Sequence, residues 1–292
     1  MQYRAEHFIY RRLKKIYDEV SILDSSNFYE ASVTTNMEDL TREVKKFAIN
    51  RKQEIENLKE RENYRREFMG NVSHELKTPL FTVQGYIDTL LDGGAIKDKT
   101  LRKKYLERAQ IGVERLVYIV EDLDMISKLE MGEVKFKFEK FDIIQLIQEV
   151  FDLLEMTADK KNIILMFDQK YTTPVYVIAD KGSTQQVLTN LIINSIKYGK
   201  ENGTTEVAVE NLTESKIIVR VRDNGEGIEE KNLTRIFERF YRIDKSGSRA
   251  EGGSGLGLSI VKHIIEGHNQ KLYVQSQIDV GSEFSFTLDK AQ

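Results

Sequence analysis

The chain has 292 residues, 31% charged and 40% hydrophobic, which is typical of globular protein and long enough for two or three domains. Its net charge of −3 argues against a nucleic-acid-binding protein, whose phosphate-contacting surface usually leaves a basic excess. The absence of cysteine excludes disulfides, cysteine nucleophiles and thiolate metal sites. Because no apolar run is long enough to span a bilayer and no signal peptide opens the sequence, we expect this chain itself to be soluble.

Residues 1–60 show an interrupted helical pattern. An apolar stripe over residues 8–23 gives way to turn-forming residues 24–27, and helical spacing resumes near Met37. We interpret this region as a helical linker that forms a parallel coiled coil, with a single monomeric arm as the alternative. The basic cluster in residues 11–15 follows an apolar start. Such clusters often lie just inside a membrane helix, but an ordinary helix surface explains this one equally well.

Residues 61–132 are predicted to form a helical hairpin, with a turn at Asp92-Gly93-Gly94 because glycine ends helices. Two amphipathic arms of this length cannot bury their stripes on each other alone, so two hairpins are expected to pair as a four-helix bundle. The sequence therefore predicts a homodimer. The apolar positions recur every three or four residues: Val72, Leu76, Val83, Ile87 and Leu90 on the first arm, and Tyr105, Ala109, Gly112, Leu116, Ile119, Leu123 and Ile126 on the second.

Residues 133–292 change to a mixed pattern in which strands come in adjacent pairs, which favours an α+β sandwich with helices on one face of a mixed sheet. Asp142 is predicted to cap the first helix of this region. Strands are predicted at residues 134–138, 163–167, 175–178, 206–209, 217–221, 272–276 and 284–288, and helices at 143–154, 183–198, 233–241 and 256–266.

The string from Asn71 to Leu80 contains a histidine with unusual neighbours. On a helix Val72 and Leu76 face the core, so His74 points outward, and a neutral imidazole is a competent phosphoryl acceptor. Glu75 is suited to hold the proton on the other ring nitrogen, and Thr78, one turn on, is suited to position a water for the reverse hydrolysis. A lone exposed histidine would otherwise be an inert surface residue.

Two glycine-rich segments are candidates for nucleotide binding. In residues 223–228, Asp223 is an acceptor suited to an adenine amino group, and Gly225 and Gly227 let the backbone pass close to the base. Residues 253–258, Gly-Ser-Gly-Leu-Gly-Leu, open a helix whose N–H groups suit a triphosphate. Neither segment is a Walker A loop or a Rossmann fingerprint, and either alone is equally explained as a structural turn.

Asn190 and Asn194 lie one turn apart on an otherwise apolar predicted helix. A carboxamide oxygen is a suitable ligand for Mg²⁺ and Lys197 supplies charge for phosphate, although a pair of helix-surface asparagines is the simpler explanation by itself. Phe237 and Phe240 are predicted to anchor a short helix. Residues 244–252 are polar and glycine-containing, so they are interpreted as a lid over nucleotide or as a plain surface loop.

These segments, in this order, resemble the sensor histidine kinases of two-component systems. The string around His74 resembles their H box, residues 190–198 the N box, and residues 223–228 and 253–258 the first and second glycine boxes. Residues 237–240 resemble the F box between them. Residues 1–60 more loosely resemble a HAMP linker, without its proline and glycine positions. The ordered set is far more specific than any single segment.

The resemblance implies a multidomain fold: an all-α coiled coil and dimeric four-helix bundle over residues 1–60 and 61–132, then an α+β sandwich ATP-binding domain over 133–292. It implies ATP and Mg²⁺ as cofactors, His74 as the phosphoacceptor, Glu75 as base and Thr78 as the residue for phosphatase activity. Asn194 is then the metal ligand. The implied nucleotide-binding residues are Asn190, Lys197, Tyr198, Asp223, Gly225, Gly227, Arg242, Gly253, Gly255, Leu256 and Gly257.

The implied partners are a second copy of the chain and the receiver domain of a response regulator. The resemblance also implies a full-length protein anchored in the membrane upstream of residue 1, with this part at the cytoplasmic face of the bacterial inner membrane. Two alternatives share the same nucleotide fold. One is an ATP-driven conformational clamp, against which the string at His74 argues, and the other is a catalytically inactive signalling scaffold, against which Asn194 and Asp223 argue.

Overall fold

The computed structural model describes residues 11, 15, 37–92, 96–243 and 254–291. The predicted interruption at residues 24–27, the predicted lid at 244–252 and Gly253 therefore lie outside the described residues. The chain divides into two compact units, Met1–Gly70 and Asn71–Gln292. None of the described helices is both long and apolar enough to cross a bilayer.

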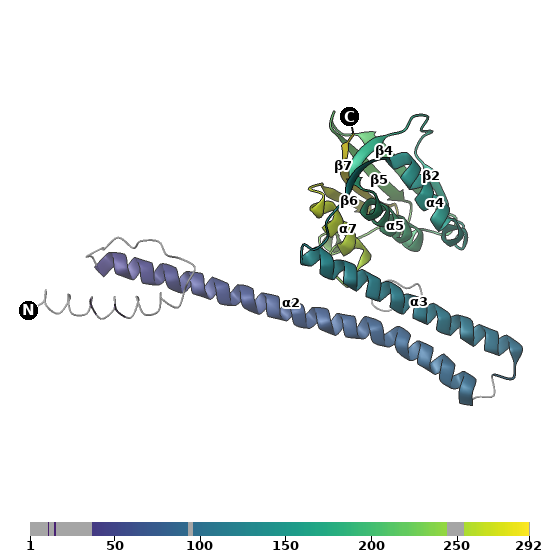
Figure 1. The fold of residues 1–292 in the computed structure, drawn as a ribbon, viewed down its shortest axis with the longest axis horizontal. Coiled ribbons are helices and arrows are strands. Elements are labelled where there is room, and N and C mark those ends of the chain that lie inside the picture. The colour runs from purple at the N-terminus through teal and green to yellow at the C-terminus, as the bar shows by residue number, and fades with distance from the viewer. Residues whose placement is uncertain (1–10, 12–14, 16–36, 93–95, 244–253, 292) are drawn as a thin grey trace, which may run out of the picture. The chain divides into compact units, whose positions relative to one another are not determined.

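Two long helices precede the sheet. Helix α2 spans Met37–Asp92 and helix α3 spans Lys99–Glu130 (Figure 1). The restart of helical spacing near Met37 is thus confirmed, and the expected boundary between residues 60 and 61 falls inside α2. The Asp98 carboxylate caps α3 by accepting from the N–H groups of Thr100 and Leu101, at 2.8 and 3.1 Å.

The C-terminal part of α2 and helix α3 form the predicted hairpin. The rings of Tyr86 and Tyr105 stack with centroids 5.6 Å apart, one from each helix. Four positions of the predicted stripe on α3 are buried, namely Ala109, Gly112, Ile119 and Ile126, and Leu90 is buried on α2. The periodicity therefore identified the buried face of α3.

Seven strands form one mixed sheet in the order β1-β3-β7-β5-β4-β2, with β6 also paired to β7. The β2–β4 pair is parallel and all other pairs are antiparallel, as expected for an α+β domain. The strands are β1 Phe138–Asp142, β2 Ile164–Phe167, β3 Tyr176–Asp180, β4 Thr204–Asn211, β5 Lys216–Asp223, β6 Leu272–Gln277 and β7 Gly281–Lys290.

Helices α4 (Ile143–Asp159), α5 (Lys181–Tyr198) and α7 (Gly257–Gly267) cover one face of this sheet (Figure 1). As predicted, Asp142 caps α4 by accepting from the Ile144 N–H at 3.1 Å. The core between helices and sheet contains fully buried side chains from both layers, such as Leu191 on α5 and Phe286 on β7. Ile126 of α3 is also part of this core.

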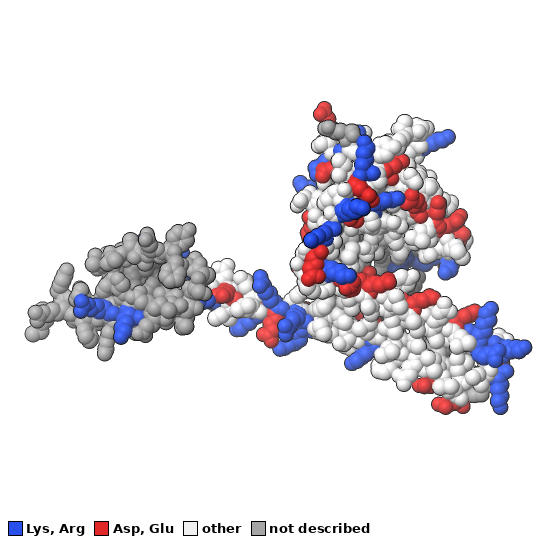
Figure 2. Space-filling view, viewed as in Figure 1, with Lys and Arg blue, Asp and Glu red and all other residues white. Residues whose placement is uncertain are grey.

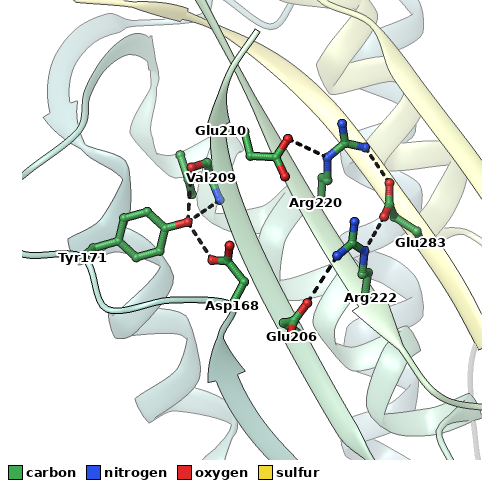
Figure 3. Close-up of polar contacts among 8 residues, drawn as sticks. All are labelled: Asp168, Tyr171, Glu206, Val209, Glu210, Arg220, Arg222 and Glu283. Carbon is green, nitrogen blue, oxygen red and sulfur yellow. Dashed lines mark hydrogen bonds and ion pairs between the residues drawn. The ribbon is translucent and has the colours of Figure 1, made fainter.

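The opposite face of the sheet carries a charged ladder across three strands (Figure 3). Glu283 on β7 accepts from Arg220 Nη1 at 2.7 Å and from Arg222 Nε at 2.5 Å, and these arginines also pair with Glu210 and Glu206 on β4. Burial raises the pKa of Glu283, but the hydrogen bonds from Arg222 and Arg220 outweigh it and hold that pKa below its ordinary value. On this face of the sheet, which the helices do not cover, the charged side chains are thus paired with one another.

Two predicted elements are wrong. Residues 134–137 form no strand because the ladder with β3 begins only at Phe138, opposite Asp180, where β3 ends and α5 begins. The Asp180 carboxylate accepts from the Lys137 N–H at 2.7 Å, in place of a backbone partner. The alternating apolar residues thus belong to a segment that packs through its side chains, as in the contact of Phe136 with His268, but is not paired with another strand.

The predicted helix at residues 233–241 is also wrong. Helix α6 covers only Glu230–Leu233, and turns follow to Tyr241. Phe240 has φ of +59° and its N–H donates to the Gly255 carbonyl at 2.9 Å, so a tertiary contact replaces helical bonding. The Tyr241 hydroxyl donates to the Asn232 side chain at 2.9 Å and holds the turn closed.

Candidate functional site

His74 lies on α2 with an exposed side chain, as the spacing of Val72 and Leu76 predicted. The Thr78 hydroxyl donates to the His74 carbonyl at 3.3 Å, one turn along the same helix. Pro79 is buried inside α2 and has no N–H to donate to the Glu75 carbonyl, yet the helix continues to Asp92. The imidazole of His74 is therefore presented on a solvent-facing helix surface.

Helix α5 positions the two asparagines. The Asp180 carboxylate caps the helix by accepting from the Ser183 N–H at 2.7 Å, and fully buried residues such as Leu191 fix its inner face. Asn190 and Asn194 are half-buried on the side that faces away from the sheet. The Asn190 amide donates to the Gly257 carbonyl at 3.4 Å, which joins α5 to the start of α7.

Asp223 ends β5 and is held by two backbone donors. Its Oδ1 accepts from the Gly225 N–H at 2.9 Å and from the Ser282 N–H at 3.2 Å. Burial raises the pKa of Asp223, and these two hydrogen bonds partly oppose that effect. With Oδ1 engaged, the second carboxylate oxygen remains an acceptor for a ligand N–H.

The second glycine segment closes over the start of α7. Gly255 has φ of +71° and a Cβ there would lie 2.8 Å from the Phe240 Cα, so this turn requires glycine. The side chain of Leu256, which is among the residues predicted to bind nucleotide, is fully buried in the core. Leu256 is the N-cap residue of α7 and makes no side-chain cap bond to its first N–H groups.

Two neighbouring cavities, of about 740 and 540 Å³, lie beside α5. Both are lined by Asn194, Lys197, Tyr198 and Arg242, so the two cavities adjoin each other. The larger adds Asn190, Gly255 and Gly257, and the smaller adds Asp223 and Gly227.

The structure thus brings together ten of the predicted nucleotide and metal residues from segments far apart in the sequence: Asn190, Asn194, Lys197, Tyr198, Asp223, Gly227, Arg242, Gly255 and Gly257 line the cavities, and Gly225 packs against the Tyr198 carbonyl beside them. By contrast His74, Glu75 and Thr78 line neither cavity. The predicted phosphoacceptor and the predicted nucleotide-binding residues therefore form two separate groups in the structure.

Lys161, Asp122 and Ser254 are among the cavity residues that had not been expected. Lys161 lines both cavities and its Nζ donates to the Lys197 carbonyl at 2.6 Å. Asp122 of α3 lines the larger cavity and accepts from the Ser254 hydroxyl at 2.9 Å, while burial raises the pKa of Asp122. Only the serine within the glycine segment carried a sequence signal, because Lys161 and Asp122 look like ordinary helix-end and helix-surface charges.

Comparison with known families agrees with this division into two groups of residues, one around His74 and one around the cavities. Residues 64–132 match the His Kinase A (phospho-acceptor) domain, which includes His74. Residues 179–292 match the histidine kinase-, DNA gyrase B- and HSP90-like ATPase domain, which includes all the cavity residues from α5 onward. The fold and site therefore define a phosphoacceptor hairpin followed by an ATPase domain.

The chain belongs to the sensor histidine kinases of two-component systems. It is 35% identical over 225 residues to the sensor histidine kinase WalK of Bacillus subtilis. The aligned region covers 77% of this chain and 36% of that protein. The chain thus spans about a third of the length of this relative.

Solved structures show the same fold. The histidine kinase AdeS of Acinetobacter baumannii is 28% identical with a TM-score of 0.59, over 75% of this chain and 98% of that one. The histidine kinase ThkA, solved in complex with the response regulator protein TrrA, is 28% identical with a TM-score of 0.60, over 77% of this chain and 61% of that one.

Proposed function

We propose that this chain is the catalytic part of a sensor kinase that transfers the γ-phosphoryl group of ATP to His74 and passes it to an aspartate of a response regulator. The observation that carries the proposal is the shared lining of the two cavities. A single α5 face joins Asp223, suited to adenine, to the glycine turn at Gly255, suited to phosphates.

In the proposed nucleotide site Asp223 accepts from the adenine amino group through its free oxygen, while Gly227 lets the backbone lie against the base. Lys197 and Arg242, which line both cavities, neutralise phosphate charge. The start of α7, next to Gly257, offers backbone N–H groups to the same phosphates. Catalysis is then mainly positioning plus charge neutralisation.

Asn194 fits a magnesium ion because its amide oxygen is a hard ligand on the cavity wall, between the proposed base and phosphate regions. Bound Mg²⁺ would neutralise charge on the phosphates and orient them for in-line transfer. One protein oxygen suffices, since Mg²⁺ in nucleotide sites keeps several waters and phosphate ligands. Asn190 orients the neighbouring turn through the Gly257 carbonyl.

In the transfer itself an imidazole nitrogen of His74 attacks the γ-phosphorus, and the bond to the bridging oxygen of ADP breaks. Glu75 takes the proton from the other ring nitrogen, so the product is neutral at the ring. For the reverse task, Thr78 would hold a water for hydrolysis of the acyl phosphate on the response regulator. Its hydroxyl already lies on the His74 side of the helix.

We further propose that the chain acts as a homodimer at the cytoplasmic face of a bacterial inner membrane, anchored by segments that precede residue 1. The dimer is supported by the mainly uncharged surface that the hairpin presents (Figure 2). It is also supported by exposed apolar side chains there, such as Phe81 and Leu91. The ThkA–TrrA complex supports a response regulator as partner.

The test is incubation with γ-labelled ATP and Mg²⁺, with His74→Gln beside the parent chain. Acid-labile, base-stable label in the parent and none in His74→Gln is the expected result. Label that persists in His74→Gln would move the acceptor to another residue and contradict the proposal.

Asp223→Asn separates binding from chemistry in the same assay. Loss of a hydrogen bond to a charged group is expected to weaken ATP binding roughly 10- to 100-fold. A binding constant unchanged in Asp223→Asn would refute the adenine assignment. An unlabelled parent chain that still binds Mg-ATP would support the inactive-scaffold alternative.

A further inference from the structure

Helix α3 lies close to α2 a few residues after His74. A Cβ at Gly112 would lie 2.5 Å from Val83 Cγ2 and 3.5 Å from the Pro79 carbonyl oxygen, so a larger residue would force Val83 to move. Both helices rise by the same amount per residue, so residues that follow Gly112 on the antiparallel helix α3 lie beside residues that precede Pro79 on α2. Arg115, three residues beyond Gly112, is therefore directed toward the part of α2 that carries Glu75.

The side chains confirm that register. Arg115 Nη2 lies 3.5 Å from Glu75 Oε2, and each side chain is only 25% exposed. By comparison, the hairpin pair Lys103–Glu107 lies within one helix at 3.7 Å, with side chains 80% and 58% exposed. An ion pair shielded on both sides and linking two helices restrains its carboxylate better than a solvated pair within one helix.

Arg115 also reaches the nucleotide site. It lines the 740 Å³ cavity together with Asn194, Lys197 and Arg242. Its Nε is buried and, within the described part of the chain, has no hydrogen-bond partner. A guanidinium has five N–H donors in a rigid fork, so contact with Glu75 through Nη2 leaves donors for a second anionic group.

We propose that Arg115 is a positioning residue for phosphoryl transfer, which holds Glu75 in place beside His74 from the opposite helix. This inference rests on the proposed function and deepens it. Arg115 fixes the carboxylate that receives the imidazole proton, and its remaining donors face the cavity from which the phosphoryl group arrives. The bonds made and broken are those of the transfer to His74, and Arg115 neither gains nor loses a proton.

The first measurement is steady-state autophosphorylation of the full chain with γ-labelled ATP. Arg115→Ala is expected to lower kcat on the order of 10- to 100-fold, because misplacement of a reacting group carries such a cost. The KM for ATP should change less than about twofold, since the variant retains Asp223 and Lys197. Arg115→Lys keeps the charge but loses the fork, and should recover only part of kcat.

A double-mutant cycle with Glu75→Gln shows whether Arg115 acts through Glu75. If it does, Arg115→Ala in the Glu75→Gln background should cause no further loss of kcat. Independent, multiplicative losses would overturn the inference, because Arg115 would then act directly on nucleotide or on structure. A rise in KM with kcat unchanged would overturn it in the same way.

Arg108→Ala is the matched control, since Arg108 is an exposed arginine on the same helix that lines neither cavity. It should leave both kcat and KM unchanged. If Arg115→Ala behaves like Arg108→Ala while the parent chain is labelled on His74, the inference fails and the proposed function stands. If the parent chain carries no label, it is the proposed function that fails.

Discussion

The hairpin and the sheet domain bury their apolar side chains to different extents. In the sheet domain Phe286 is 0% exposed and belongs to a core closed by three helices. On the hairpin Phe81 is 62% exposed and Ile87 43% exposed. One copy of the chain therefore completes the core of the ATPase domain but leaves an apolar hairpin surface uncovered.

We infer from this difference in burial that the hairpin and the sheet domain derive their stability from different sources. The sheet domain closes its core within the chain, so its unfolding should not depend on concentration. Within the described residues nothing covers the rest of the apolar hairpin surface, so we expect the stability of the hairpin to depend on association with a second copy. Substitutions can separate these two behaviours.

The largest effect should come from the closed core. Phe286→Ala is expected to lower the free energy of unfolding of the ATPase domain by about 3–5 kcal/mol, because it leaves a cavity that its neighbours cannot fill. Chemical denaturation followed by circular dichroism measures the change. The matched variant Phe81→Ala should change the free energy of unfolding of the ATPase domain by less than about 0.5 kcal/mol, because Phe81 lies on the hairpin and outside this core. Equal losses in the two variants would remove the contrast between the regions.

The next effect should come from the hairpin stripe. Ile87→Asp is expected to raise the dimer dissociation constant at least about tenfold, because a carboxylate would be buried in the bundle without a partner. Sedimentation at several concentrations measures the constant. Nucleotide binding by the sheet domain should stay unchanged. A dimer as tight as that of the parent chain would show that another face of the hairpin pairs.

The smallest effect should come from the charged ladder on the outer sheet face. The ion pairs of Glu283 should contribute fully to the free energy of unfolding above pH 4.5, the ordinary pKa of this carboxyl group. That contribution should be lost as the pH falls through the lowered pKa of Glu283 in the folded state. Glu283→Gln is expected to cost about 1 kcal/mol at pH 7, since the arginines remain partly exposed. The cost should disappear in acid.

Urea unfolding at a series of pH values tests the ladder. Glu210→Gln is the matched control, because Glu210 pairs with Arg220 alone at 3.3 Å and is more exposed. It should show a smaller loss with a weaker pH dependence. A loss in Glu283→Gln that does not change with pH would mean that the ion pairs are not its source.

Much of the fold followed from local periodicity. The stripe on α3 contained every position that the hairpin buries there, and turn and cap residues such as Asp142 marked where helices begin. Periodicity failed where a tertiary contact replaced a local one. Phe240 gives its N–H to Gly255 instead of continuing a helix, and the segment before Phe138 has no neighbouring strand.

For the site, the order of residue types along the chain was enough to predict a phosphoacceptor and a set of nucleotide-binding residues. Only the tertiary structure decided which side chains meet. It placed Leu256 in the core, Lys161 and Asp122 on the cavity wall, and Arg115 opposite Glu75. Local spacing along a helix sets the direction of a side chain. Its partner across another element depends on packing between segments distant in the chain, which no local pattern records.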